Sequence, residues 1–181
     1  MHTILENAVE KLVTELCGAK AWRELEHKAE AEGYAPEGTS LPGESTERLV
    51  LTAAEWMGLT CEEMLEALGE FMPLYVAETL PRQDGLAATG LLRALDELDG
   101  RRAQGPYTLP KMRSVELRVE GGGDQARTIH CESLYEGVAS VLAGYLKGLG
   151  QRFGTPLEVR HIVRRSPALP TDTFEVILAA A

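Results

Sequence analysis

The stretch VELRVEGGGD, residues 115–124, is the point at which the chain changes from helical to strand periodicity. Apolar and charged residues alternate over its first six positions, which is typical of a strand with one buried face. Three glycines and Asp124 follow, and a second alternating run ends near Cys131. Because these glycines separate two strands rather than a strand and a helix, they predict a hairpin turn and not a phosphate-binding loop.

Three further segments follow the hairpin. Apolar residues at helical spacing predict a helix over residues 138–150, and alternating patterns predict strands over 157–163 and 174–178. The order strand, strand, helix, strand, strand is typical of an antiparallel sheet with a helix packed against it. We therefore expect a four-stranded antiparallel sheet and an α+β fold class.

The first hundred residues carry helical patterns only. Their apolar positions predict five helices, over residues 5–16, 19–31, 49–57, 61–71 and 91–98. Thr60 and Glu63 form a capping box that starts the fourth helix, and Pro73 is expected to kink or interrupt it. Loops are predicted at 33–43 and 81–85. We expect one domain, in which residues 1–65 form a helical N-terminal subdomain and residues 66–181 a subdomain of helices and the sheet.

The composition is that of a globular protein, since 44% of the 181 residues are hydrophobic and 25% are charged. No apolar run approaches the roughly 18 residues that a membrane span needs, and the N-terminus lacks the basic charge of a secretion signal. Cys17, Cys61 and Cys131 lie far apart and are odd in number, which argues against disulfides and for a reducing compartment. We expect a soluble protein of the cytoplasm.

The formal net charge is −10, which disfavours binding to nucleic acids or to anionic membranes. The charge is uneven: residues 1–100 carry 7 basic and 20 acidic side chains, whereas residues 101–181 carry 11 and 8. This asymmetry fits two structural halves, although a solvated acidic face of the helices explains it equally well.

The sequence contains no motif typical of a catalytic or metal site, so we expect no enzymatic activity and no bound metal. His2 and His27 are predicted to be exposed. His130 and His161 fall on strands, where a hydrogen-bonded structural histidine is favoured over a metal or catalytic role. Acidic side chains of the fourth helix are interpreted as a solvated face rather than as general acids or bases: Glu62, Glu63 and Glu66.

Four motifs lie at residues 17–22 (CGAKAW), 58–70 (GLTCEEMLEALGE), 95–101 (LDELDGR) and 110–118 (PKMRSVELR). Their order and spacing resemble the heme-nitric oxide/oxygen-binding (H-NOX) family, the gas-sensor domain also found in soluble guanylate cyclase. The first motif is similar to the Phe-Gly-x-x-x-Trp junction between the family's first two helices, and the third to the helix that carries its axial histidine. The resemblance runs from Met1 to about Val163 and implies the family's α+β fold.

The residues that would hold heme depart from the family's pattern. Asp99 stands at the position of the histidine that binds the iron, and Val115 at that of a proline that presses against the porphyrin. The Tyr-x-Ser-x-Arg motif for the heme propionates corresponds to Cys131, Ser133 and Tyr135, so only the serine is retained. A carboxylate substitutes poorly for imidazole, and a tyrosine cannot form arginine's charged fork to a propionate. We therefore expect no heme cofactor, and expect Asp99 to be exposed or paired with an arginine.

The resemblance implies a sensory or regulatory module that acts on a signalling protein such as a kinase, a cyclase or a chemoreceptor, and the departures imply that it works without heme. Small residues favour a residual cavity, lined by Asp99 and Tyr135, that would take an apolar small molecule. These small residues are Gly137, Ala139, Ser140 and Gly144. A heme-based gas sensor with a substitute axial ligand, His130 or Cys131, is the alternative.

Overall fold

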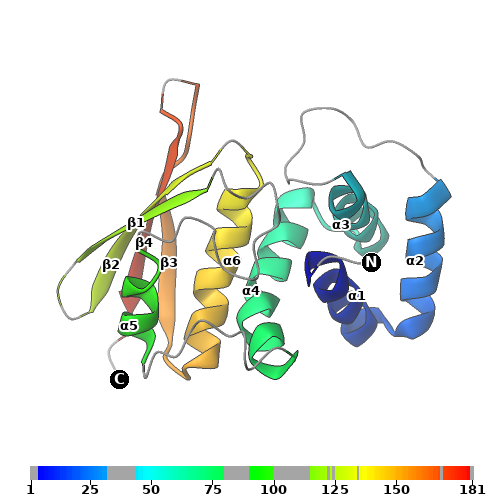
Figure 1. Ribbon diagram of the computed structural model, residues 1–181, viewed down its shortest axis with the longest axis horizontal. Coiled ribbons are helices and arrows are strands. Elements are labelled where there is room, and N and C mark those ends of the chain that lie inside the picture. The colour runs from blue at the N-terminus through cyan, green and yellow to red at the C-terminus, as the bar shows by residue number, and fades with distance from the viewer. Residues whose placement is uncertain are drawn as a thin grey trace.

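Helices make up the first part of the chain and a sheet most of the second (Figure 1). The computed structural model describes residues 4–31, 44–79, 90–99, 115–121, 123, 125–133, 135–167 and 169–179. The helices are α1 (Ile4–Cys17), α2 (Ala19–Ala31), α3 (Glu44–Met57), α4 (Cys61–Thr79), α5 (Leu91–Asp96) and α6 (Val138–Arg152). The strands are β1 (Glu116–Gly121), β2 (Ala126–Glu132), β3 (Leu157–Val163) and β4 (Thr171–Leu178). The predicted loops at 33–43 and 81–85, together with His2, lie outside the described residues.

Helices α1–α4 enclose the first of two buried clusters. Its fully buried side chains include Val9 of α1, Leu25 of α2 and Met64 of α4. Gly18 follows α1 and Gly58 follows α3, both with positive φ (89° and 69°), a conformation that glycine adopts without steric cost at the end of a helix. The predicted ends of the first and third helices, at Gly18 and Gly58, are confirmed.

Helix α4 starts at the predicted capping box. Thr60 Oγ1 accepts a hydrogen bond from Glu63 N (3.2 Å), and Glu63 Oε2 accepts one from Thr60 N (2.8 Å). These bonds satisfy backbone N–H groups that the first turn of a helix cannot pair internally. The helix continues through Pro73 to Thr79, so the proline does not interrupt it.

The four strands form one antiparallel sheet in the order β1-β2-β4-β3. The register places Val119 opposite Ile129, Ile129 opposite Phe174, and Phe174 opposite His161. Residues paired in register point to the same face of a sheet, so these four side chains share a face. Figure 1 shows α6 packed against this face, and α4 on the side of α6 that faces away from the sheet. β1 and β3 are the edge strands.

The second buried cluster lies between the sheet and helices α5 and α6. Leu95 of α5, Ile129 of β2, Leu146 of α6 and Phe174 of β4 are all 0% exposed. If a gap large enough for a water molecule lay beside these side chains, part of their surface would be exposed to it. The sheet, α5 and α6 are therefore in close contact at these residues.

Helices α4 and α6 join the two clusters through direct backbone contact. A Cβ atom at Gly144 would overlap the carbonyl oxygen of Glu66 and lie 2.7 Å from Glu70 N. Cβ atoms at Gly69 and Gly148 would likewise overlap carbonyl oxygens of the facing helix. Glycine at these three positions therefore permits the short distance between the two helices.

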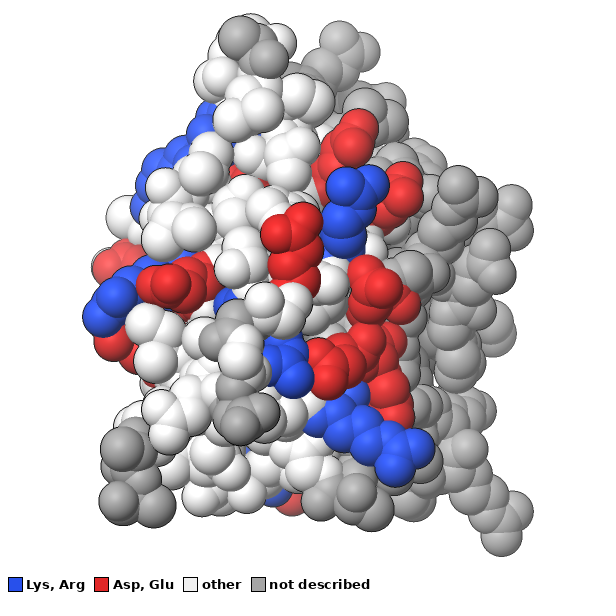
Figure 2. All heavy atoms as spheres, turned by 90° about the vertical axis from the view of Figure 1, so that its left-hand side faces the viewer, with Lys and Arg blue, Asp and Glu red and all other residues white. Residues whose placement is uncertain are grey.

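The outer face of the sheet carries charges of both signs. Figure 2 shows acidic and basic side chains interleaved on this side of the molecule. Arg160, for example, pairs with Glu158 (2.8 Å) and with Glu175 (3.4 Å). Such a surface differs from the continuous basic stripe typical of nucleic-acid binding. Among the described residues, no helix is both long enough and apolar enough to cross a membrane.

Candidate functional site

Asp99 lies in the turn after α5, and its side chain is exposed, which is one of the two outcomes expected. Its Oδ1 accepts a hydrogen bond from Val119 N (2.9 Å). Val119 belongs to β1, an edge strand, whose outward N–H groups have no neighbouring strand to pair with. The carboxylate therefore binds the edge of the sheet and holds the turn after α5 against it.

A second carboxylate ties α5 to the sheet. Asp96 accepts hydrogen bonds from Arg127 Nε (2.5 Å) and Nη2 (3.1 Å), and Arg127 also donates to the carbonyl oxygen of Gly123 (2.6 Å). The hydrogen bond from Arg127 holds the pKa of Asp96 below its ordinary value. Asp96, the last residue of α5, and Asp99, in the turn after it, thus attach the C-terminal end of α5 to β2 and β1.

The other four positions matched to heme contacts lie near the start of β1 and the end of β2. Val115 is 8% and Cys131 1% exposed, and both belong to the second buried cluster, against which Tyr135 also packs. Burial raises the pKa of the Cys131 thiol to about 12, so the sulfur keeps its proton at neutral pH. Ser133 is buried, and its Oγ accepts a hydrogen bond from Tyr135 N (3.0 Å). The structure brings Val115, Cys131 and Tyr135 together, whereas Asp99 lies outside their cluster.

His130 and Cys131, the two candidates for a substitute iron ligand, point to opposite faces of β2 because neighbouring side chains in a strand alternate. Cys131 faces the second buried cluster. His130 Nδ1 lies 3.1 Å from Thr173 Oγ1, and its Nε2 lies 3.6 Å from a carboxylate oxygen of Glu120. Both ring nitrogens of His130 therefore have protein partners, as predicted for a structural histidine.

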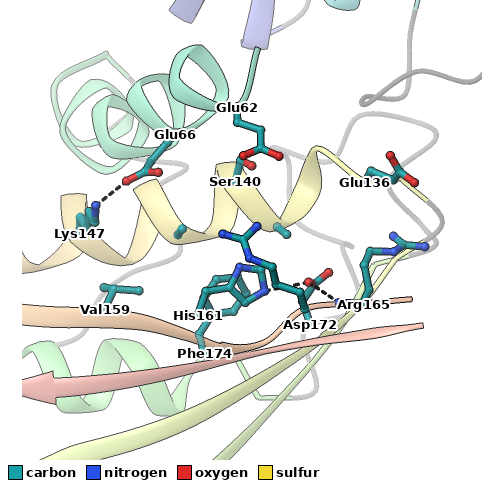
Figure 3. A pocket seen from close by; sticks show the side chains of 13 residues that line it. Glu62, Glu66, Glu136, Ser140, Lys147, Val159, His161, Arg165, Asp172 and Phe174 are labelled. Carbon is teal, nitrogen blue, oxygen red and sulfur yellow. Dashed lines mark hydrogen bonds and ion pairs between the residues drawn. The ribbon is translucent and has the colours of Figure 1, made fainter. Parts of the chain in front are cut away.

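A cavity of about 400 Å³ lies between the start of α4, α6 and the β3–β4 side of the sheet (Figure 3). Ala139 and Ser140, two of the small residues expected around a residual cavity, line it, but Asp99 and Tyr135 do not. Most of its polar lining consists of ionisable side chains, which come from three parts of the fold: Glu62, Glu66, Glu136, Lys147, His161, Arg164, Arg165 and Asp172. Nothing in the sequence singled out Lys147, Arg165 or Asp172, because they belong to no motif.

Interactions between side chains hold the walls of this cavity in place. His161 Nε2 lies 2.8 Å from Asp172 Oδ1, which also accepts a hydrogen bond from Arg165 N (3.0 Å). The His161 ring stacks on Phe174, with their centroids 4.3 Å apart. His161 is therefore a partnered structural histidine, as predicted.

The acidic side chains at the start of α4 differ in their surroundings. Glu62 and Glu63 are exposed, as predicted. Glu66 is only partly buried, since its side chain is 38% exposed, and it forms an ion pair with Lys147 of α6, which the sequence did not predict. The two residues are 81 positions apart, and only the packing of α4 on α6 brings them together.

His27 and the three cysteines do not line this cavity. His27 is exposed, as predicted. Cys17, Cys61 and Cys131 are free thiols. Within the described ranges, no three His, Cys, Asp or Glu side chains form a group that could hold a metal ion.

Known proteins share this architecture. The model of the haem-NO-binding family matches residues 2–161. The chain is similar to an H-NOX protein from S. oneidensis in the Fe(II) state, a triple mutant (16% identity, 99% of this chain and 97% of that chain covered, TM-score 0.76). It is also similar to an oxygen-binding H-NOX domain related to soluble guanylate cyclases (14% identity, 99% and 96% covered, TM-score 0.73). No curated protein matches the chain.

A helical first part followed by a four-stranded antiparallel sheet, with α5 and α6 on one of its faces, is the architecture of H-NOX domains. This chain belongs to the haem-NO-binding (H-NOX) family, because the family's match covers residues 2–161 of its 181. The resemblance seen in the four sequence motifs and the α+β fold class are thereby confirmed. H-NOX domains are sensor modules that typically bind heme and gases.

Proposed function

We propose that this chain is an H-NOX sensory or regulatory module that works without heme and acts on a signalling partner. The observation that carries the proposal is the state of Asp99, at the position matched to the family's axial histidine. Its carboxylate is exposed and accepts a hydrogen bond from Val119 N at the edge of β1. A side chain held at the sheet edge does not reach into the core, and a carboxylate replaces imidazole poorly as a heme ligand.

The positions matched to the propionate contacts support the same proposal. Cys131 is a buried, protonated thiol, and Tyr135 stands where the family has arginine, so neither offers a positive charge to a propionate. Arg127 also points to the inner face of β2, but its guanidinium already pairs with Asp96. The residues at the positions matched to the family's heme contacts therefore do not fit heme.

Close packing around α5 is a further support. Leu95, Ile129 and Leu146 are 0% exposed, so no water-sized space lies beside them. Gly144, one of the small residues expected to leave a cavity, instead contacts the backbone of α4. This packing does not support the binding of an apolar small molecule between Asp99 and Tyr135, and we do not propose one.

The proposed role is regulatory, without catalysis, in the cytoplasm, with a kinase, a cyclase or a chemoreceptor as the class of partner. Membership of a sensor family supports this role. Helix α4 runs across the division proposed between residues 1–65 and 66–181, and it packs on α6. A change in one part of the domain would therefore reach the other through the contact between α4 and α6.

Expression in heme-supplemented cells tests the proposal. We expect the purified protein to lack a Soret band and to unfold cooperatively, because the described side chains between α5, α6 and the sheet pack closely without a cofactor. The heme content per chain is measured by the pyridine hemochrome assay, and unfolding by circular dichroism. One heme per chain would overturn the proposal. Loss of that heme in His130→Ala or in Cys131→Ser would then establish the substitute-ligand alternative.

A further inference from the structure

The cavity between α4, α6 and the β3–β4 side of the sheet contains an unsatisfied cationic group. Arg165 Nη1 is buried and has no hydrogen-bond partner among the described residues. Asp172, a carboxylate in the same wall, is already bound by His161 Nε2 (2.8 Å) and by the backbone N of Arg165 (3.0 Å). A buried charged donor without an acceptor is disfavoured, so this wall is suited to a molecule that brings an acceptor.

Carboxylates occupy other parts of the cavity wall. Glu62 extends from α4 toward α6, and Glu136 lies in the turn before α6 (Figure 3). Neither side chain has a hydrogen bond or an ion pair with another described residue. Glu66 differs, because it pairs with Lys147. Arg164, an exposed cation, lines the cavity as well. Two exposed, unpaired carboxylates, one exposed guanidinium and one buried, unsatisfied guanidinium therefore line a single cavity.

Four apolar side chains also line the cavity. Ala139 and Ala143 of α6 form one side of it, and Val159 and Phe174 of the sheet form the other. The volume of about 400 Å³ lies within the range of roughly 300–1,000 Å³ that is usual for small-molecule sites. Because most of the lining is polar, the cavity suits a charged ligand better than an apolar one.

We propose that this cavity binds a small zwitterion, with a carboxylate directed to Arg165 and an ammonium group directed to Glu62 and Glu136. A simple anion would be repelled by the two glutamates, and a simple cation would leave Arg165 without an acceptor. An α-amino acid carries both groups and is small enough for the cavity. None of the positions matched to heme contacts lines this site, so the inference goes beyond the proposed function and does not depend on it.

An occupant of this cavity would contact both parts of the domain. Glu62 belongs to α4, which packs in the first buried cluster, whereas Arg165 and Phe174 belong to the sheet side. The zwitterion would thus link α4 to the β3–β4 side of the sheet across α6. This places the ligand where its binding changes the coupling between the two parts.

Thermal unfolding of the full chain with each of the twenty standard α-amino acids tests the proposal, and calorimetric titration follows for those that stabilise it. For each such amino acid, two matched probes lack one charge: the amine without its carboxylate, and the acid without its ammonium group. We expect at least one amino acid to stabilise the protein saturably. Each matched probe should bind about tenfold more weakly or worse, because it loses one charge-assisted contact. Inorganic phosphate, a simple anion, should not stabilise.

Variants locate the binding site. Arg165→Gln and Glu62→Gln should each weaken binding about tenfold or more. The matched control Arg160→Gln removes an exposed guanidinium from β3 on the outer face of the sheet and should leave binding unchanged. Because Glu62 is exposed, Glu62→Gln is expected to fold even if Arg165→Gln does not.

Three results would overturn the proposal: no stabilisation of the wild type by any amino acid, binding of phosphate as tight as that of the amino acids, or wild-type affinity in Glu62→Gln. The assay contains no heme. Its failure would therefore leave heme independence intact, and the presence of heme in purified protein would leave this site intact.

Discussion

At the scale of single residues, Asp99 has a structural role that differs from binding iron: it forms a hydrogen bond with the edge of the sheet. β1 is an edge strand, and the outward N–H of Val119 would otherwise face solvent or a second chain. The Asp99 carboxylate accepts that hydrogen bond at 2.9 Å. Unpaired edge groups are templates for association between strands, so this contact also protects the sheet edge.

Asp99→Ala should lower the free energy of unfolding by about 1 kcal/mol or less, because the hydrogen bond to Val119 N is exposed and water can replace it. Urea unfolding of the wild type and the variant measures this difference. Asp99→Asn, which keeps an acceptor oxygen, is the control and should lie closer to the wild type. A loss of several kcal/mol in Asp99→Ala would contradict the exposed position of this side chain.

The cysteines should differ sharply in reactivity. Cys17 is exposed, whereas Cys131 is 1% exposed and burial raises the pKa of its thiol to about 12. The thiolate is the reactive form, so iodoacetamide should modify Cys17 in the native protein and Cys131 only after unfolding. Mass spectrometry of the digested protein identifies the modified residue. Rapid modification of native Cys131 would be incompatible with close packing around β2.

At the scale of elements, the contact between α4 and α6 joins the two buried clusters. Gly69 of α4 and Gly144 and Gly148 of α6 all face backbone atoms of the other helix. Backbone atoms cannot rotate away as a flexible side chain can. The distance between these helices is therefore sensitive to a single added methyl group.

Gly144→Ala should destabilise the fold by about 1–3 kcal/mol, because its Cβ would overlap the carbonyl oxygen of Glu66. Alanine favours a helix over glycine by about 1 kcal/mol, so a net loss would show that the overlap outweighs propensity. The matched control is Gly121→Ala, where a Cβ meets nothing within 4 Å, and its effect should stay within about 0.5 kcal/mol. Chemical denaturation measures the free energy of unfolding of both variants. An equal loss in Gly144→Ala and Gly121→Ala would argue against close contact between α4 and α6.

The ion pair between Asp96 and Arg127 makes the attachment of α5 dependent on pH. The pKa of Asp96 is lowered in the folded state, so the pair's contribution is complete above the unfolded value near 3.9 and is lost as the pH falls through the lower folded value. Asp96→Asn should therefore reduce stability by about 1 kcal/mol at neutral pH and by less in acid. Denaturation at about pH 7 and about pH 3 measures both. If Asp96→Asn lost the same free energy of unfolding at both pH values, the titration of Asp96 would not be linked to stability.

At the scale of the whole molecule, local signals predicted most of the elements. The capping box at Thr60 and Glu63 marked the start of α4, and Gly18 marked the end of α1. The change from helical to alternating spacing at residues 115–124 predicted the hairpin of β1 and β2. These signals depend on neighbours within a few positions, which is why sequence alone reveals them.

Contacts between distant segments could not be predicted in the same way. The pairing of Glu66 with Lys147 and the contact of Gly69 with α6 join residues more than seventy positions apart. The cavity depends on the same packing, because Glu62 and Arg165 come from opposite parts of the fold. Comparison with the family's motifs identified the positions where heme contacts are replaced, such as Asp99. Only the three-dimensional packing reveals the charged cavity.

Titration of the purified wild-type chain with hemin, followed at the Soret band, tests heme independence most directly. The wild type and Asp99→Ala should show the same weak, unsaturated change in absorbance, because neither supplies an axial imidazole or a propionate-binding arginine. Asp99→His restores only the imidazole and should bind weakly, since Cys131 and Tyr135 remain. A Soret band that saturates at one heme per wild-type chain would contradict heme independence.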